Sequence, residues 1–387
     1  MKTFTEQEHI DILADIIAMK SVNDGEHEVA LYIKDLLGQY GIESEIIPVE
    51  ENRSNLIASV GSGSPVIGLS GHMDVVSAGN EAAWTSDPFV LAERDGKLYG
   101  RGTNDMKAGL LNIVLAMIEM KENGLLEEGK GSIKFMATVG EEVGGAGARQ
   151  LYEEGHMDDV DYLWVTEPSV DDIIFSHKGS MNYRVDSIGE AAHSSMPHLG
   201  HNAIDTLAEF IVAMNDKFRS NAPSNETLGE FVINATIIEG GQQTNSIPES
   251  AHIEINSRTI PEFDNQKVKD TFEELAAEFN KDGERIVVTN TMDLESVFTD
   301  GKSSFVEHMV EVGEKALGWE LPIIGSPGVT DAANLLKDKD PSFGFAMFGP
   351  GETRMAHKVD EYVDKDIYVK FTKIIQEVCQ LTFADAQ

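Results

Sequence analysis

The chain has 387 residues, of which 41% are hydrophobic, and this length predicts two domains rather than one. Its 67 acidic residues outnumber its 30 basic residues and give a net charge of −37, which argues against binding to nucleic acid or to an anionic membrane surface. The single cysteine, Cys379, excludes an intrachain disulfide and a metal cluster held by thiolates.

Two further features bear on where the protein works. Residues 1–20 carry acids throughout a helical pattern and lack the apolar core of a signal peptide. No apolar run approaches the roughly 20 residues that a membrane-spanning helix needs. We therefore expect a cytoplasmic protein, with neither a membrane nor nucleic acid among its partners.

Helical and strand patterns alternate in the first part of the chain. Apolar residues recur at helical spacing within residues 1–40, and residues 108–118 are apolar on nearly all sides, which predicts a buried helix. Strands are predicted near 43–49, 55–60, 66–70, 133–138 and 162–165. Strands that alternate with helices favour a largely parallel sheet covered on both faces.

The pattern changes near residue 179, where a β-α-β-β-α-β order begins. Its strands are predicted at 180–188, 231–238, 251–259 and 285–292, and its helices at 203–218 and 265–280. This is the order of a ferredoxin-like α+β unit. The first pattern resumes after about residue 300 and ends in a helix at 366–383. We therefore predict an α/β fold with a mixed, largely parallel sheet in residues 1–178 and 293–387, and an inserted domain in residues 179–292.

A histidine and an aspartate stand at the end of one predicted strand. The apolar run that begins at Val66 leads into His72 and Asp74, which are two residues apart. Side chains alternate faces along a strand, so these two would point the same way. An imidazole beside a carboxylate is typical of a metal ligand whose ring must be oriented. Taken alone, however, such a pair more often has a structural role.

Acidic residues follow the neighbouring predicted elements in the same way. Asp105 lies where a glycine-rich turn enters the buried helix, Glu141 and Glu142 follow the strand at 133–138, and Glu167 follows the strand at 162–165. Strand ends that share one edge of an open α/β sheet line its ligand crevice. Because buried carboxylates repel one another unless a cation lies among them, the sequence predicts a metal site at this edge.

The ligand types narrow the choice of metal. One histidine with three or four carboxylates suits zinc, manganese or cobalt. Two ions about 3.5–4 Å apart would need a bridging carboxylate and a second histidine, for which His357 is the candidate. Two adjacent acids, Glu141 and Glu142, suggest one metal ligand and one proton carrier.

Several spaced motifs together resemble one family over essentially the full chain. They are His72-Met73-Asp74, Gly102-Thr103-Asn104-Asp105-Met106-Lys107-Ala108-Gly109, Glu141-Glu142, Glu167-Pro168 and Ala356-His357. The family is that of acetylornithine deacetylase and succinyl-diaminopimelate desuccinylase, which also contains aminoacylases and metallopeptidases. The resemblance implies a zinc-peptidase-like catalytic domain at 1–178 and 293–387 and a lid and dimerisation domain at 179–292.

The resemblance also implies a role for each candidate in the first domain. His72, Asp105 and Glu167 would bind one divalent ion, and Asp105, Glu142 and His357 would bind the other. Zinc is the expected metal, with cobalt or manganese as alternatives. Asp74 would hydrogen-bond to His72, and Glu141 would act first as general base and then as general acid.

Three residues of the inserted domain match motifs of the family's lid. His193, in Ala192-His193-Ser194-Ser195, resembles the histidine that reaches the active site from the partner subunit of a homodimer. It would donate a hydrogen bond to the developing oxyanion. Asn245 and Arg258 match positions that hold the carboxylate of the substrate, a task that suits the fork of an arginine.

The substrate expected from the resemblance is a small N-acyl amino acid. Succinyl-diaminopimelate desuccinylase is the best match, acetylornithine deacetylase is the next, and a dipeptidase or aminopeptidase of the same family is a further alternative. A binding protein without activity is disfavoured because every expected ligand and Glu141 are present. A dehydrogenase is disfavoured because Gly100-Arg101-Gly102-Thr103 lacks the third glycine of a dinucleotide-binding turn.

Overall fold

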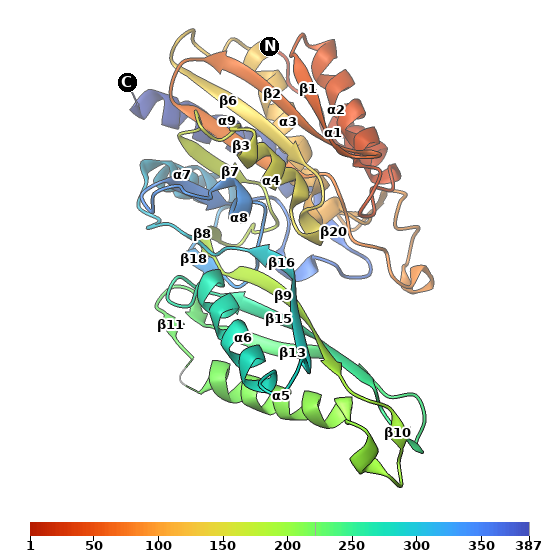
Figure 1. The fold of residues 1–387 in the computed structure, drawn as a ribbon. Coiled ribbons are helices and arrows are strands. Elements are labelled where there is room, and N and C mark those ends of the chain that lie inside the picture. The colour runs from red at the N-terminus through yellow and green to blue at the C-terminus, as the bar shows by residue number, and fades with distance from the viewer. Residues whose placement is uncertain (221, 387) are drawn as a thin grey trace. The chain divides into compact units, whose positions relative to one another are not determined.

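A computed structural model describes residues 1–220 and 222–386 (Figure 1). The chain divides into two compact units. The first contains Met1–Ser176, Phe298–Gly325 and Thr330–Gln387, and the second contains His177–Val297 with the short return segment Ser326–Val329. The sequence analysis placed the inserted domain at 179–292 and did not anticipate the return segment. Among the described helices, none is long and apolar enough to cross a membrane.

The first unit is built on one large sheet with the strand order β1-β2-β6-β3-β7-β19-β8-β17, with β18 paired to β8. These strands are β1 (Ser44–Glu50), β2 (Arg53–Ser62), β3 (Val66–His72), β6 (Gly131–Thr138), β7 (Tyr162–Val165), β8 (Ile173–His177), β17 (Val297–Phe298), β18 (Ile323–Ser326) and β19 (Gly344–Met347). The four central strands β6, β3, β7 and β19 are parallel, whereas β1, β2 and β8 pair antiparallel with their neighbours. The prediction of a mixed, largely parallel sheet in an α/β fold is confirmed.

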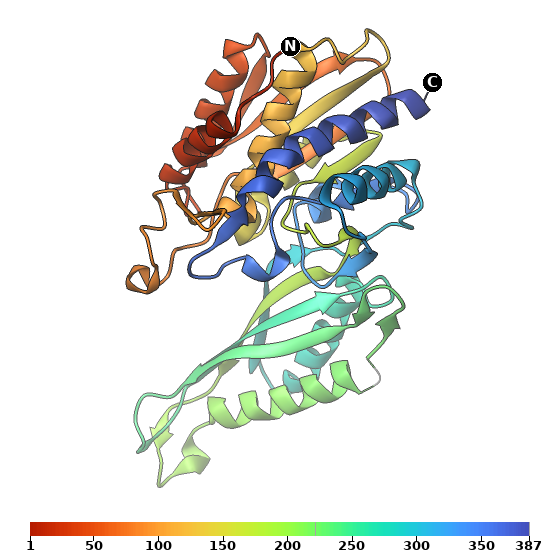
Figure 2. The same cartoon turned by 180° about the vertical axis from the view of Figure 1, so that it is seen from behind.

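Helices cover both faces of this sheet. They are α1 (Glu6–Ala18), α2 (Glu26–Gln39), α3 (Ala108–Glu122), α4 (Ala146–Glu153), α7 (Ser304–Leu317), α8 (Ala332–Leu335) and α9 (Lys365–Asp385). Figure 2 shows α3, α9 and α7 across one face, and Figure 1 shows α4 in front of the other. Because both faces are covered, every residue of β3 after Val66 is buried, which explains its continuous apolar run.

The core of the first unit gathers around Trp164 on β7. Its ring stacks on Phe348 with centroids 6.2 Å apart, and Phe371 of α9 meets it edge-on. The indole nitrogen donates a hydrogen bond to the carbonyl oxygen of Phe348 at 2.6 Å, so the one polar atom of this side chain has a partner. A small sheet of β20 (Tyr362–Asp364), β5 (Lys97–Tyr99) and β4 (Ala92–Arg94) lies outside this core.

The second unit has the predicted β-α-β-β-α-β order. Its elements are β9 (Gly179–Ile188), α5 (Ala203–Arg219), β13 (Val232–Gly240), β15 (Ser250–Thr259), α6 (Asn265–Phe279) and β16 (Ile286–Leu294), with the short strands β10 (Ala192–His193), β11 (Ser224–Asn225), β12 (Gly229–Glu230) and β14 (Ser246–Ile247). The four long strands form an antiparallel sheet in the order β13-β15-β9-β16. The two helices bury Phe210 and Phe272 against this sheet, and β13 is left at its edge.

Candidate metal centre

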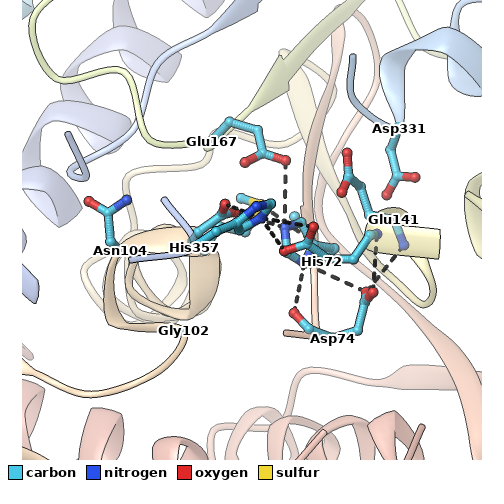
Figure 3. Close-up of polar contacts among 12 residues, drawn as sticks. His72, Asp74, Gly102, Asn104, Glu141, Glu167, Asp331 and His357 are labelled. Carbon is cyan, nitrogen blue, oxygen red and sulfur yellow. Dashed lines mark hydrogen bonds and ion pairs between the residues drawn. The ribbon is translucent and has the colours of Figure 1, made fainter. Parts of the chain in front are cut away.

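The acidic and histidine side chains of the first unit come together at one edge of the parallel strands. His72 is the last residue of β3, Glu141 and Glu142 follow β6 in a helical turn (Glu141–Val143), and Glu167 lies two residues after β7. Since β6, β3 and β7 are adjacent and parallel, their carboxyl ends meet at the same edge. Figure 3 shows His72, Glu141 and Glu167 facing one another there.

The ring of His72 is oriented by the main-chain carbonyl of Asp74, two residues further along the chain. Its Nδ1 lies 2.9 Å from the carbonyl oxygen of Asp74, and a carbonyl can only accept a hydrogen bond, so Nδ1 carries the proton. The other ring nitrogen, Nε2, then faces the acids, 3.2 Å from Oδ1 of Asp105 and 3.7 Å from Oε1 of Glu167. The ring is only 1% exposed, which leaves Nε2 directed at this cluster alone.

Asp105 lies between the two histidines. Its Oδ1 faces His72, and its Oδ2 lies 3.4 Å from Nε2 of His357. The same nitrogen of His357 lies 3.0 Å from the carboxylate of Glu142. One carboxylate therefore spans two neighbouring groups of ligand-type atoms, as a bridge between two ions must.

The buried acids of this cluster repel one another. Burial and the neighbouring Glu167 raise the pKa of Glu141 well above its ordinary value, and burial likewise raises the pKa of Glu167. Burial opposes protonation of His72, but Glu167 and Asp105 outweigh it and raise its pKa well above the usual range. Positive charge at this place would relieve the repulsion, so the donor set fits divalent cations.

Two sets of ligand atoms among the described residues are close enough to hold an ion. One is His72 with Glu141 and Glu167, and the other is His72 with Asp105 and Glu142, with all atoms of a set within 4.8 Å of one another. Glu141, which the sequence analysis assigned to proton transfer, therefore belongs to one of these sets together with Glu167, an expected ligand. Membership of a set does not by itself separate the base from the ligands.

Asp74 makes different contacts from those expected. The sequence analysis predicted a hydrogen bond between its side chain and His72, but the carboxylate oxygen Oδ1 lies 3.6 Å from Nδ1, and the main-chain carbonyl makes the shorter contact. The carboxylate instead accepts hydrogen bonds from the backbone N–H groups of Glu141 and Glu142, both at 3.2 Å. Asp74 thus ties the end of β3 to the turn after β6 (Figure 3).

Asp331 is a buried acid of this site that the sequence analysis did not select. It is 3% exposed, the hydroxyl of Thr138 donates a hydrogen bond to its Oδ2, and Figure 3 shows it beside Glu141. Burial raises its pKa to about 7. Nothing in the position of Asp331 along the chain placed it beside Glu141.

In the second unit, His193 and Asn245 lie together at one end. His193 on β10 pairs with Ser246 on β14, and the N–H of Ser194 donates to the carbonyl of Asn245 at 3.0 Å. The N–H of Ser195 donates to Nδ1 of His193 at 3.2 Å. Nδ1 is therefore the acceptor, so the neutral ring carries its proton on Nε2 of an exposed side chain.

Arg258 lies at the other end of the same unit. It faces Ser180 on β9 and Val232 on β13, near the last residue of β15, whereas Asn245 precedes the first. The eight steps along the chain from Ser250 to Arg258 alone span about 26 Å of strand. The structure therefore does not bring Arg258 and Asn245 of one chain to a common point.

The comparison with known proteins identifies the family. Residues 68–381 match the sequence profile of peptidase family M20/M25/M40. The chain belongs to this family. A protein of Staphylococcus epidermidis named probable succinyl-diaminopimelate desuccinylase is 39% identical over 402 residues, which cover 98% of each chain. The resemblance drawn from the motifs is confirmed, and the chain is a hydrolase acting on amide bonds.

Solved structures of the M20 family share the fold over nearly the whole chain. An M20 family metallo-carboxypeptidase from Sulfolobus solfataricus has a TM-score of 0.83 at 18% identity and covers 97% of this chain and 99% of its own. A protein described as a dinuclear metal binding peptidase of the M20 family from Bacillus subtilis has a TM-score of 0.69 at 19% identity, with 98% of both chains covered. At these identities the likeness supports the fold and leaves the substrate open.

Proposed function

We propose that this member of the M20 family is a succinyl-diaminopimelate desuccinylase, which hydrolyses the linear amide between the succinyl group and the amino acid. The observation that carries the proposal is the 39% identity to a protein of that name over 98% of both chains. The acid-rich strand ends described above are consistent with it. The same proposal places the enzyme in the cytoplasm.

Two divalent ions form part of the proposal. His72, Asp105 and Glu167 would hold one, and Asp105, Glu142 and His357 would hold the other, with Asp105 shared between them. Mixed imidazole and carboxylate ligands favour zinc, with cobalt or manganese as alternatives. When bound, such ions polarise an amide carbonyl and make a bound water acidic at neutral pH.

Glu141 would move the protons of the reaction. Its carboxylate lies beside His72 and Glu167, and its backbone N–H is held by Asp74. From this position it would take a proton from the attacking water and deliver it to the leaving amine. Glu141 is therefore assigned to proton transfer and Glu142 to metal binding, because Glu142 is the acid in contact with His357.

Arg258 would bind a carboxylate of the substrate. Its guanidinium is half buried, burial lowers its pKa, and within the described part of the chain no acid forms an ion pair with it. A half-buried guanidinium that forms no ion pair with a described acid is suited to an anionic ligand. The exposed Nε2–H of His193 would supply the hydrogen bond to the oxyanion, and Asn245 lies beside it.

A homodimer through the second unit is also proposed. The edge strand β13 is exposed along nearly its whole length, with Ile237 51% and Ile238 64% exposed, and Val212 on the adjacent helix α5 is 70% exposed. An apolar edge of this kind is normally covered. A two-fold dimer that paired these edges would let His193 and Asn245 of one chain serve the site of the other.

The test is a substrate panel with the purified protein. N-succinyl-diaminopimelate, N-acetylornithine and simple dipeptides are assayed after chelation and after addition of Zn²⁺, Co²⁺ or Mn²⁺. We expect turnover of the succinylated substrate to exceed that of the others, to disappear on chelation and to return with metal. Preference for N-acetylornithine or a dipeptide would contradict the desuccinylase proposal, and full activity without metal would contradict the two-ion mechanism.

A further inference from the structure

Glu361 is a completely buried carboxylate next to the loop that carries Asp105. It is 0% exposed and accepts hydrogen bonds from three backbone N–H groups of one loop: that of Gly102 at 3.0 Å, of Asn104 at 2.8 Å and of Asp105 at 3.0 Å. Arg101 donates a further, charged hydrogen bond to its Oε2. The carboxylate is therefore enclosed by backbone N–H groups and one guanidinium, all from residues 101–105.

These contacts fix the loop that carries Asp105. Gly102 has a φ of +88°, a left-handed conformation that glycine adopts without strain, and this bend turns the following N–H groups towards one point. The N–H of Asp105 is one of the three that reach Glu361. Because this hydrogen bond holds the backbone of Asp105, it also sets where the two oxygens of its side chain can lie between His72 and His357.

The same carboxylate is coupled to His357 through Arg101. Nη2 of Arg101 donates to the carbonyl oxygen of His357 at 3.5 Å and to that of Ser77 at 3.2 Å, while Nη1 is held by Glu361. His357 has a φ of +64°, which is uncommon for a side chain of its size. A backbone in this conformation persists only where its surroundings hold it, and Arg101 supplies one of those contacts.

A second pair of contacts joins the same two loops. The N–H of Glu352 donates to Oδ1 of Asn104 at 2.7 Å, and Nδ2 of Asn104 donates to the carbonyl of Glu352 at 3.2 Å. Figure 3 shows Asn104 and Gly102 next to His357. These contacts hold the loop of Asp105 against the loop of His357, and Glu361 is the buried residue that contacts the first of these loops.

We propose that Glu361 is a positioning residue for the second metal site: it fixes the separation of Asp105 and His357 and thereby the affinity of that site for its ion. The inference rests on the proposed two-ion function and adds to it a residue that contacts neither ion nor substrate. His72 and Glu167 are carried by β3 and by the loop after β7. Within the described part of the chain, the Glu361 carboxylate forms its hydrogen bonds and ion pair with residues 101–105 and with neither of these two segments, so the first site would depend on Glu361 through Asp105.

The test is a calorimetric titration of metal-free full-length protein with Zn²⁺, at a temperature well below that of unfolding. Wild type is compared with Glu361→Gln, which places an amide NH₂ among N–H donors. Partners behind metal ligands typically change affinity 10–100-fold, so we expect the second ion to bind about 10–100-fold more weakly and the first ion to be affected less. Activity should return when Zn²⁺ exceeds the weakened dissociation constant.

Glu119→Gln is the matched control. Glu119 is also a buried acid, 6% exposed, but it accepts hydrogen bonds from the N–H of Phe4 and the amide of Gln376, both at 2.7 Å, on helix α3. Its substitution should lower the unfolding temperature and leave both affinities for Zn²⁺ unchanged. A purely structural role of Glu361 predicts the same behaviour for Glu361→Gln, and that result would overturn the inference.

Arg101→Lys is the second variant and is informative if Glu361→Gln does not fold. A lysine keeps the positive charge but cannot contact Glu361 and the carbonyl of His357 at once. It should weaken the second site selectively, and equal weakening of both sites would count against the inference. If wild-type protein bound fewer than two ions, both the proposed function and this inference would be contradicted. If wild type bound two ions and neither variant changed the affinity of the second site, this inference alone would be overturned.

Discussion

The carbonyl oxygen of Asp74 lies 2.9 Å from Nδ1 of His72, so the backbone of the aspartate, rather than its carboxylate, orients the ring. The carboxylate is then left to accept the N–H groups of Glu141 and Glu142. One residue thereby positions an imidazole on β3 and two acids after β6. This arrangement separates two functions of Asp74 that mutation of its side chain can test.

Substitution of Asp74 by Asn should weaken the turn more than it disturbs His72. The side-chain amide keeps one acceptor oxygen but turns an NH₂ group towards an N–H donor, whereas the main-chain carbonyl that faces His72 is unchanged. We expect activity or metal affinity to fall about 10–100-fold, measured as kcat/KM and by Zn²⁺ titration.

The control for this variant is Asp161→Asn. Asp161 also accepts a backbone N–H, that of Val66 at 2.8 Å, but at the opposite end of β3. The Asp161→Asn variant should leave kcat/KM unchanged. Equal losses in the two variants would show that general destabilisation, and not the turn after β6, explains the result for Asp74.

Glu141 and Glu142 are adjacent in sequence, and their proposed roles predict opposite effects. Glu141→Gln should lower kcat about 10²–10⁴-fold while both ions stay bound, because a general base is lost and no ligand is removed. Glu142→Gln should lose the ion that contacts His357, because Glu142 is the acid 3.0 Å from that ring. Metal analysis and kcat measured on the same preparations distinguish the two. The reverse pattern would mean that the base and the ligand have been exchanged.

The sequence predicted the elements that carry the centre because local patterns determine them. Apolar runs located β3, β6 and β7, and an acid or histidine after each run indicated a common edge, since parallel strands present their carboxyl ends together. The near-complete burial of α3 followed from its uniformly apolar composition. The roles of the residues at this edge remain predictions.

Contacts between segments far apart in the chain could not be predicted from the sequence in the same way. Arg101 and Glu361 are separated by 260 positions, and an acid four residues after His357 gives no sign that it is buried. Asn245 and Arg258 both match family positions that hold the carboxylate of the substrate, but β15 runs between them as an extended strand and places them at opposite ends. The three-dimensional arrangement of the strands and loops, and not the spacing along the chain, determines whether Arg101 meets Glu361 and whether Asn245 lies near Arg258.

Glu8 predicts a pH dependence of stability at the N-terminus. Its carboxylate accepts the N–H of Thr5 and binds Lys2, and these contacts lower the pKa of Glu8 from 4.5 to about 2. Because the folded state has the lower pKa, the stabilisation is present above about pH 4.5 and is lost as the pH falls towards 2. Urea unfolding should therefore show Glu8→Gln to be less stable than wild type at pH 6, with a difference that shrinks at pH 4 and again at pH 3.

Glu28→Gln serves as the comparison, since Glu28 is exposed in the first turn of α2, whose N-cap makes no side-chain hydrogen bond. Its difference from wild type should change less over the same range. A Glu8→Gln difference that stayed constant from pH 6 to pH 3 would show that the capping contacts do not depend on the charge of Glu8.

Mixed dimers provide the most direct test of the proposed exchange of His193 between subunits. Glu141→Gln and His193→Ala should each be nearly inactive alone, because one lacks the base and the other the oxyanion donor. In a dimer of one chain of each kind, the site that keeps Glu141 would receive an intact His193 from its partner. Half of the sites in each mixed dimer should therefore be active.

The alternative, in which His193 serves its own chain, predicts no recovery, since every site would then lack either Glu141 or His193. Differently tagged chains, co-expressed and purified by both tags, ensure that only mixed dimers are assayed. A second mixture, Glu141→Gln with Glu142→Gln, should stay inactive because both changes lie in the first unit and neither partner can replace the missing acid. Recovery in this control would mean that acids of two chains combine in one site, which would contradict the assignment of Glu141 and Glu142 to a site within one chain. A fully active monomer would show that no residue is exchanged at all.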